Sequence, residues 1–176
     1  VAKLASIFPG PYIHIGGDEC PHVQWENHPE CRAIMEQEGL KDTMELQGWF
    51  TSKMARLVAN YGKRAMGWDE VVDAPEIDKS VIVMSWRGLN GAIKATSRGH
   101  NVILCPEAGG GCYFDRYYTS DDWEPGNLSL SPLKNVFDLD FSMEELPEDC
   151  QKLIMGGQGN MWTEVLRSGR AIEYMY

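Results

Sequence analysis

Two adjacent carboxylic acids, Asp18 and Glu19, follow a double glycine at the end of a short apolar run. Close carboxyl groups push each other's pKa values apart, so one can stay protonated as an acid while the other is charged. Gly16 and Gly17 permit backbone torsions that can aim both groups into a pocket. A bare Asp-Glu pair is usually a solvated turn, but the preceding strand pattern and His14 favour a chemical role.

Aromatic and acidic residues also follow other apolar runs. The residues in such positions are Trp68, Trp86, Trp162 and Glu164. A single Trp often packs under a loop, but a set of them at strand ends predicts one shared cleft, since α/β sheets and barrels carry their sites at the carboxyl ends of strands. Aromatic rings stack on pyranose faces, and carboxylates bind hydroxyls or protonate a glycosidic oxygen, so the cleft favours a carbohydrate.

Two histidine-containing clusters could instead suggest a metal. The first is His14, Asp18 and His22, and the second is Cys20, His22, His28 and Cys31. The first has helical spacing, but the double glycine breaks any such helix, and the Cys-Pro-His spacing of the second is not a standard zinc-ligand pair. Ordinary packing is favoured for both, with His14 as a hydrogen-bonding residue inside the sheet. We therefore expect no metal and no cofactor.

The elements that must position these residues alternate between strands and helices. Strands are predicted at 12–15, 64–68, 81–86, 101–105 and 153–157. Continuous Val and Ile runs are typical of strands buried on both faces, as in parallel sheets. This order predicts an α/β fold.

One long helix is well specified. Asp42 can cap it, Glu45 completes a capping box, and Gly62 stops it. Its predicted apolar face consists of Leu46, Trp49, Phe50, Leu57, Val58 and Tyr61. Shorter helices are expected within 31–38, over 89–98, after Ser142 with Glu145, and near Val165; the rest of 107–151 is predicted to be a functional loop.

Composition limits the function classes. The 176 residues are 43% hydrophobic and carry a net charge of −10, which argues against disorder and against binding to nucleic acids or anionic membranes. No apolar run approaches the ~18 residues of a membrane span. The N-terminal residues show no signal-peptide pattern, and the five scattered Cys suggest no disulfide framework.

Five ordered motifs resemble those of glycoside hydrolase family 20, the β-N-acetylhexosaminidases. They are His14-Ile15-Gly16-Gly17-Asp18-Glu19, Gly67-Trp68-Asp69-Glu70, Ser85-Trp86-Arg87-Gly88, Tyr113-Phe114-Asp115 and Trp162-Thr163-Glu164. The resemblance covers nearly the whole chain, and the residues around Cys20-Pro21 and Trp25-Glu26 look most like bacterial members.

The resemblance implies a (β/α)8 TIM barrel, with residues 1–176 as a partial catalytic domain holding about strands four to eight. The first three strands would then lie outside this chain. The family's arginine for the sugar 3- and 4-hydroxyls would lie outside it too, because Arg87, Arg116 and Arg167 fall in the wrong motifs to replace it. Exposed sheet edges would favour self-association.

The resemblance also implies substrate-assisted retaining hydrolysis of terminal N-acetylhexosamine (GlcNAc or GalNAc) through an oxazolinium intermediate. Glu19 would be the acid and then the base, and Asp18 would orient the acetamido group. Tyr113 would hydrogen-bond the acetamido oxygen. The implied wall is Trp68, Trp86 and Trp162, and the implied ligands of sugar hydroxyls are Asp115 and Glu164.

Two other interpretations stay open: a non-catalytic carbohydrate-binding fragment, and a conventional retaining glycosidase with two separated carboxylates. The intact Asp18-Glu19 pair disfavours the first, and substrates lacking the acetamido group would test the second. The expected partner is an N-acetylhexosamine-containing oligosaccharide or glycoconjugate. The family function and the bacterial character imply a periplasmic or extracellular location.

Overall fold

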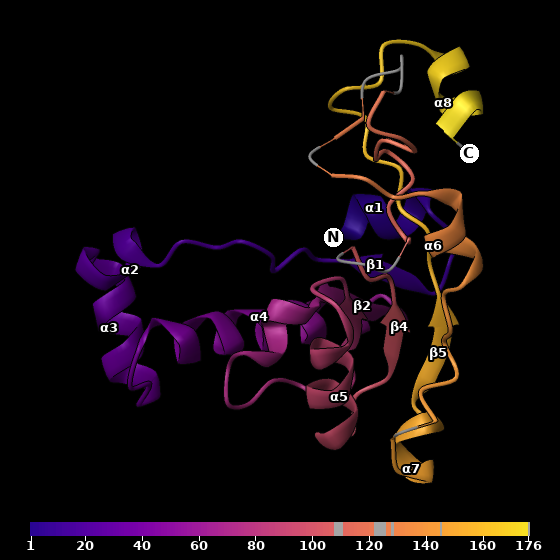
Figure 1. Cartoon of the computed structure of the whole chain (residues 1–176). Helices are drawn as coiled ribbons and strands as arrows, with labels where there is room; N and C mark the ends of the chain where they lie inside the picture. Colours follow the sequence, from indigo (N-terminus) through magenta and orange to yellow (C-terminus); the bar gives the residue numbers. More distant parts are fainter. Residues whose placement is uncertain (108–110, 122–125, 128, 145, 176) are drawn as a thin grey trace.

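The computed structural model describes residues 1–107, 111–121, 126–127, 129–144 and 146–175, which form one five-stranded sheet (Figure 1). The strands are β1 (Tyr12–His14), β2 (Arg64–Trp68), β3 (Ile82–Ser85), β4 (Val102–Leu104) and β5 (Ile154–Gly157). Each strand pairs in parallel with the next along the chain, so β1 and β5 form the two edges. The predicted α/β fold with five parallel strands is confirmed.

The central strands β2, β3 and β4 are buried on both faces, as the continuous apolar runs predicted, whereas the edge strands β1 and β5 are largely exposed. Alternate strand residues point to opposite faces, which separates the core into two clusters. One cluster packs beneath α4 (Thr43–Ala59) and α5 (Leu89–Ser97) and includes Ala65, Val81, Val83, Val102 and Leu104. The other includes Met66, Trp68, Ile82, Met84, Cys105, Cys112 and Tyr113.

The remaining helices are α1 (Ala2–Ile7), α2 (Val23–Asn27), α3 (Pro29–Glu38), the 3-10 helix η1 (Asp69–Val72), α6 (Leu133–Phe137), α7 (Glu148–Gln151) and α8 (Gly169–Met175). Of these, only η1 contributes buried residues, Val71 and Val72, to the core cluster under α4 and α5 in the part of the chain that the structure describes. Figure 1 shows α2 and α3 projecting from one side of the sheet, while the chain that leads to α8 extends above it. Within the described ranges, no helix combines the length and apolarity needed to cross a membrane.

The structure confirms α4 but changes its predicted face. Asp42 accepts a hydrogen bond from the Glu45 N–H at 2.8 Å, as the capping pattern predicted. Leu46 and Val58 are buried, whereas three other members of the predicted face, Phe50, Leu57 and Tyr61, are exposed. Small or polar residues fill the buried side instead: Thr43, Gln47, Gly48, Thr51 and Ala55. The short side chains among them, at Gly48, Thr51 and Ala55, let the helix lie close to the neighbouring backbone.

The helix predictions beyond β4 were partly wrong. Ser142 begins no helix in the part of the chain described, because its N–H and hydroxyl both bind the Asp140 carboxylate, a local turn that competes with helix formation. Its predicted partner Glu145 lies outside the described residues. The short helices α6 and α7 flank this turn, and the last helix begins at Gly169 instead of near Val165.

Candidate active site

Residues that follow the carboxyl ends of all five strands line one cavity of about 340 Å³. The lining residues are Asp18, Glu19, Trp68, Trp86, Glu107, Tyr113, Arg116, Asn127, Trp162 and Glu164. The structure thus brings together the acids and aromatic residues that sequence analysis had placed at strand ends. A cavity walled by flat rings and edged by carboxylates can hold a sugar ring and exchange protons with it.

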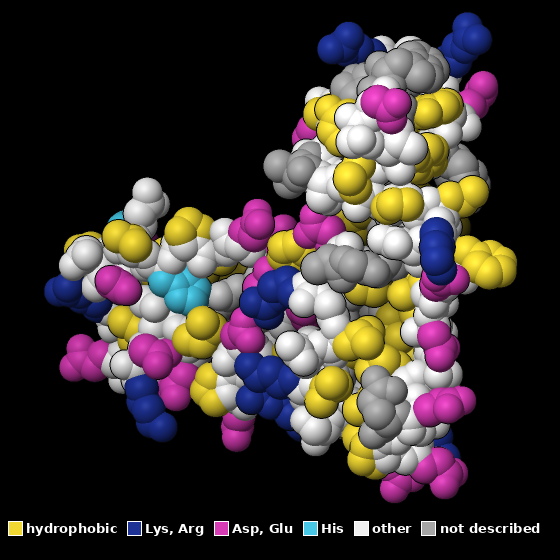
Figure 2. All heavy atoms as spheres, in the orientation of Figure 1, with side chains coloured by type: hydrophobic (Ala, Val, Ile, Leu, Met, Phe, Trp, Pro, Cys, Tyr) yellow, Lys and Arg dark blue, Asp and Glu magenta, His cyan; other side chains and the backbone are white. Residues whose placement is uncertain are grey.

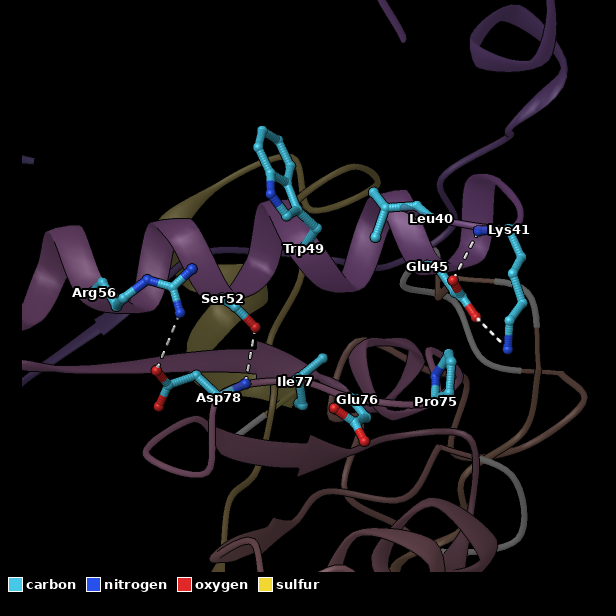
Figure 3. A pocket seen from close by; sticks show the side chains of 10 residues that line it. All are labelled: Leu40, Lys41, Glu45, Trp49, Ser52, Arg56, Pro75, Glu76, Ile77 and Asp78. Atoms are coloured by element: carbon cyan, nitrogen blue, oxygen red, sulfur yellow. Dashed lines mark hydrogen bonds and ion pairs between the residues drawn. The ribbon is translucent and has the colours of Figure 1, made fainter. Parts of the chain in front are cut away.

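A larger cavity of about 550 Å³ runs along α4 (Figure 3). The Arg56 guanidinium lies 3.9 Å from the Asp78 carboxylate, and the Ser52 hydroxyl accepts the Asp78 N–H at 2.9 Å. Trp49 points away from the 75–78 segment in this view. The segment leads into the amino end of β3, the side of a parallel sheet that serves stability more than chemistry. This cavity is therefore not the candidate site.

The turn after β1 presents the two adjacent acids. Gly16 and Gly17 have φ values of 76° and 105°, and a Cβ on Gly17 would lie 2.6 Å from a methyl of Val71. Only glycine fits this backbone at position 17. Glu19 also has a left-handed φ, 45°, which is rare without glycine and typical of functional turns. Both Asp18 and Glu19 are exposed toward the cavity.

The cavity-lining rings of Trp68, Trp162 and Tyr113 form a chain of tilted contacts that extends to His14. The Trp68 ring lies 4.8 Å from the His14 ring and 5.9 Å from the Trp162 ring, which in turn lies 6.3 Å from Tyr113. His14, at the end of the edge strand β1, accepts the Gly16 N–H at 3.1 Å through Nδ1. Partial burial lowers the pKa of His14, although the Asp18 carboxylate raises it. A neutral imidazole suits this acceptor role.

A charged network fixes the wall formed by Trp86. The indole N–H donates to Glu70 at 2.9 Å, and Arg87 donates to Asp69 and Asp73 at 2.9 Å each. Burial raises the pKa of Asp69 to about 6, although the Arg87 guanidinium lowers it. The hydrogen bond from the indole N–H to Glu70 thus fixes the orientation of the Trp86 ring in the cavity.

The structure places Asp115 below the cavity surface. Its carboxylate is fully buried and accepts a hydrogen bond from Arg116 at 3.0 Å. Arg116 also donates to Glu107, and its guanidinium lies 4.9 Å from the centre of the Tyr113 ring. Burial raises the pKa of Tyr113, which keeps its hydroxyl protonated as a donor. The sugar-binding role of Asp115 stays a prediction, and Arg116 is the group that reaches the cavity.

Sequence reasoning missed Arg116, Glu107 and Asn127 as lining residues. Glu107 could have been found by the rule used for the others, since it is a carboxylate three residues after the end of β4. Arg116 follows the Tyr113 motif, but its orientation depends on the burial of Asp115. Asn127 lies in the long loop, outside every motif and strand end, so no sequence pattern predicted that it would line the cavity.

The candidate metal clusters are dispersed in the structure. The described His, Cys, Asp and Glu side chains form no group of three that could hold a metal ion. His22, a member of both clusters, pairs with Gln47 at 2.7 Å and stacks on Trp25 with ring centres 5.3 Å apart.

Comparison with known proteins gives one consistent family. The model of glycosyl hydrolase family 20, catalytic domain, matches residues 1–176. The chain is 38% identical over 175 residues to a β-hexosaminidase of Porphyromonas gingivalis, covering 99% of this chain and 22% of that protein. It is 32% identical to a β-hexosaminidase of Vibrio furnissii, covering 98% of this chain and 28% of the relative.

A solved structure agrees with these sequences. The exo-β-N-acetylglucosaminidase of Vibrio harveyi in complex with N-acetylglucosamine matches with a TM-score of 0.83 and 31% identity, over 99% of this chain and 27% of that one. The chain thus spans less than a third of the length of these relatives.

Proposed function

The chain belongs to glycosyl hydrolase family 20, and from this premise we propose that it carries the acids and aromatic wall of a β-N-acetylhexosaminidase site. The substrate is a terminal, non-reducing GlcNAc or GalNAc residue of an oligosaccharide or glycoconjugate. The observation that carries the proposal is the single cavity lined by Asp18, Glu19, three Trp and Tyr113. The Vibrio harveyi relative, solved with N-acetylglucosamine, supports the choice of sugar.

The proposed reaction proceeds in two steps with retention. In the first, the substrate's acetamido oxygen attacks the anomeric carbon, the glycosidic bond breaks, and Glu19 gives its proton to the leaving oxygen. Asp18 accepts the acetamido N–H and stabilises the positive charge of the oxazolinium, while the Tyr113 hydroxyl donates to the acetamido oxygen. In the second step, the Glu19 carboxylate takes a proton from a water molecule, and the water oxygen attacks the anomeric carbon. This attack opens the oxazolinium ring and restores the acetamido group.

The rest of the catalytic domain would come from chain outside these residues. Five parallel strands joined by crossovers, with free edges at β1 and β5, are what part of a (β/α)8 barrel would present, and we assign them to about strands four to eight. The small fraction of each relative that the chain spans supports this assignment. Arg116 is engaged by Asp115 and Glu107, so another arginine is expected to bind the sugar 3- and 4-hydroxyls.

A conventional retaining glycosidase is the second candidate, because Glu107 and Glu164 also line the cavity and could supply a separate carboxylate nucleophile. The two mechanisms differ in what they require of the substrate. Only the substrate-assisted mechanism needs the 2-acetamido group.

The experiment compares aryl β-N-acetylglucosaminides with aryl β-glucosides in the full-length protein that contains this chain. We expect hydrolysis of the acetamido sugar and no measurable cleavage of the glucoside. Comparable turnover of both sugars would contradict the proposed mechanism. Binding of N-acetylglucosamine without turnover of either would instead support the non-catalytic interpretation.

Glu19→Gln tests the assignment of the acid in the same protein. General acid assistance is typically worth ~10²–10⁴-fold, so an alkyl N-acetylglucosaminide should lose rate by about this factor. A dinitrophenyl N-acetylglucosaminide needs little protonation and should lose far less in its first step. Equal losses for the two substrates would exclude Glu19 as the general acid.

A further inference from the structure

Gln47 joins both ends of the turn that carries the two acids. Its side-chain Nε2 donates to the Gly17 carbonyl at 2.9 Å, directly before Asp18. Its Oε1 lies 2.7 Å from Nε2 of His22, three residues after Glu19. Since an amide oxygen only accepts, His22 donates this second hydrogen bond, and one buried side chain thereby brackets residues 17–22.

The bracketed turn needs such support. Glu19 adopts a left-handed φ of 45°, and both acids are exposed. A non-glycine residue keeps this conformation only where its surroundings enforce it. Gln47 lies on α4, a 17-residue helix capped by Asp42 and packed on β2 and η1, so the support has a rigid base.

We propose that Gln47 is a positioning residue for the general acid. It lies outside the residues that line the sugar cavity, so it acts through the turn and not on the substrate. Removing its two hydrogen bonds would free both ends of the turn and let the Glu19 carboxyl move away from the glycosidic oxygen. The inference rests on the proposed role of Glu19.

The test is the leaving-group dependence of turnover in Gln47→Met. This variant keeps the side-chain length and removes both the donor and the acceptor. We expect kcat for an alkyl N-acetylglucosaminide to fall ~10-fold or more beyond any loss for the dinitrophenyl substrate, with KM within about twofold. Titration of active sites with a tight-binding thiazoline inhibitor corrects each rate for the fraction of folded protein.

Ser52→Ala is the matched control. Ser52 lies on the same helix and also makes a 2.9 Å hydrogen bond to a loop, but that loop leads away from the acids. We expect Ser52→Ala to hydrolyse the alkyl and dinitrophenyl substrates with the same rate ratio as the wild type. If Gln47→Met likewise leaves the ratio unchanged, while Glu19→Gln changes it, the positioning role is wrong and the proposed function stands. If Glu19→Gln also leaves the ratio unchanged, the assignment of the acid itself fails.

His22→Phe serves if Gln47→Met does not fold. It keeps a ring to stack on Trp25 and removes the hydrogen bond at one end of the turn. We expect His22→Phe to slow the alkyl substrate more than the dinitrophenyl substrate, by a smaller factor than Gln47→Met does. An unchanged ratio in this variant would overturn the proposal that both ends of the turn are held.

Discussion

At the scale of single residues, Asp18 and Glu19 are neighbours with separate proposed tasks. In the proposed mechanism, Asp18 faces a positive charge that exists only after the acetamido group has attacked the anomeric carbon. A thiazoline analogue carries a mimic of this charge, whereas N-acetylglucosamine does not, so the intact protein should bind the thiazoline far more tightly. We expect Asp18→Asn to weaken thiazoline binding by ~10-fold or more relative to the plain sugar, as measured by calorimetry. Equal losses for the two ligands would leave Asp18 as a structural carboxylate.

Asp69 should give the protein a pH-dependent stability. Burial raises its pKa from 3.8 to about 6, so the folded state keeps a proton at a pH where the unfolded chain has released it. Stability from this group is therefore complete below pH ~4 and lost as the pH rises through ~6, by on the order of 2–3 kcal/mol.

Asp69→Asn removes this titration. We measure the free energy of unfolding of the variant and the wild type by urea denaturation. We expect the difference, variant minus wild type, to rise by ~2 kcal/mol from pH 4.5 to pH 7.5. Parallel stability curves across this range would show that Arg87 keeps the Asp69 carboxylate ionised throughout.

The residue types and their places at strand ends were enough to predict most of the cavity. Asp18, Glu19 and Trp68 follow apolar runs, and a parallel sheet gathers such ends by geometry alone. Gln47 and Arg116 could not be predicted this way. The Gln47 contact depends on how its helix packs against the distant Gly17 backbone, and the Arg116 contacts depend on how its loop buries Asp115 beside Glu107. A polar residue in a helix pattern is indistinguishable from a solvated one until the packing is known.

At the scale of elements, helix α4 shows how close packing reverses a propensity rule. Gly48 lies in the helix interior, where Ala is normally about 1 kcal/mol better than Gly. A Cβ at this position would lie 2.7 Å from the Ala74 Cβ and 2.8 Å from the Glu76 carbonyl oxygen. We expect Gly48→Ala to lower the free energy of unfolding by about 1–3 kcal/mol through overpacking, as measured by urea denaturation.

Gly169→Ala is the control for this helix prediction. It lies at the start of α8, and a Cβ there would meet nothing within 4 Å. Its substitution should be neutral or slightly stabilising. A stabilising Gly48→Ala would mean that α4 can shift away from the 74–77 segment without cost.

The same packing explains why strands were easier to predict than helix faces. The central strands β2, β3 and β4 are apolar on both sides, so their buried character does not depend on which neighbour covers them. The buried face of α4 is made of small and polar residues, which hydrophobic periodicity does not register, while Phe50 and Leu57 remain exposed. The turn at Asp140 shows the second cause, a local side-chain hydrogen bond that outcompetes a helix start.

At the scale of the whole molecule, the sheet ends in two edge strands. β1 pairs with β2 and β5 with β4, which leaves one backbone edge of each without a strand partner among the described residues. β5 is largely exposed, and it contains Met155, Gly156 and Gly157. Such edges pair readily with other strands. Opposing this, the net charge is −10, and Figure 2 shows acidic side chains gathered over α7, beside the amino end of β5.

These opposing features predict how the 176-residue chain behaves alone. We expect it to self-associate with increasing concentration in sedimentation velocity, and to associate more at high salt, because salt screens the repulsion between negatively charged copies. Met155→Lys puts a charge on the β5 edge and should shift the chain toward monomer. Val23→Lys, on the projecting helix α2, adds the same charge at a residue that is 69% exposed and should have little effect. If net charge alone controls association, each lysine lowers the repulsion between negatively charged copies, and both variants should associate slightly more than the wild type. An equal change in the two variants would therefore contradict the role of the β5 edge, since only Met155 belongs to that strand.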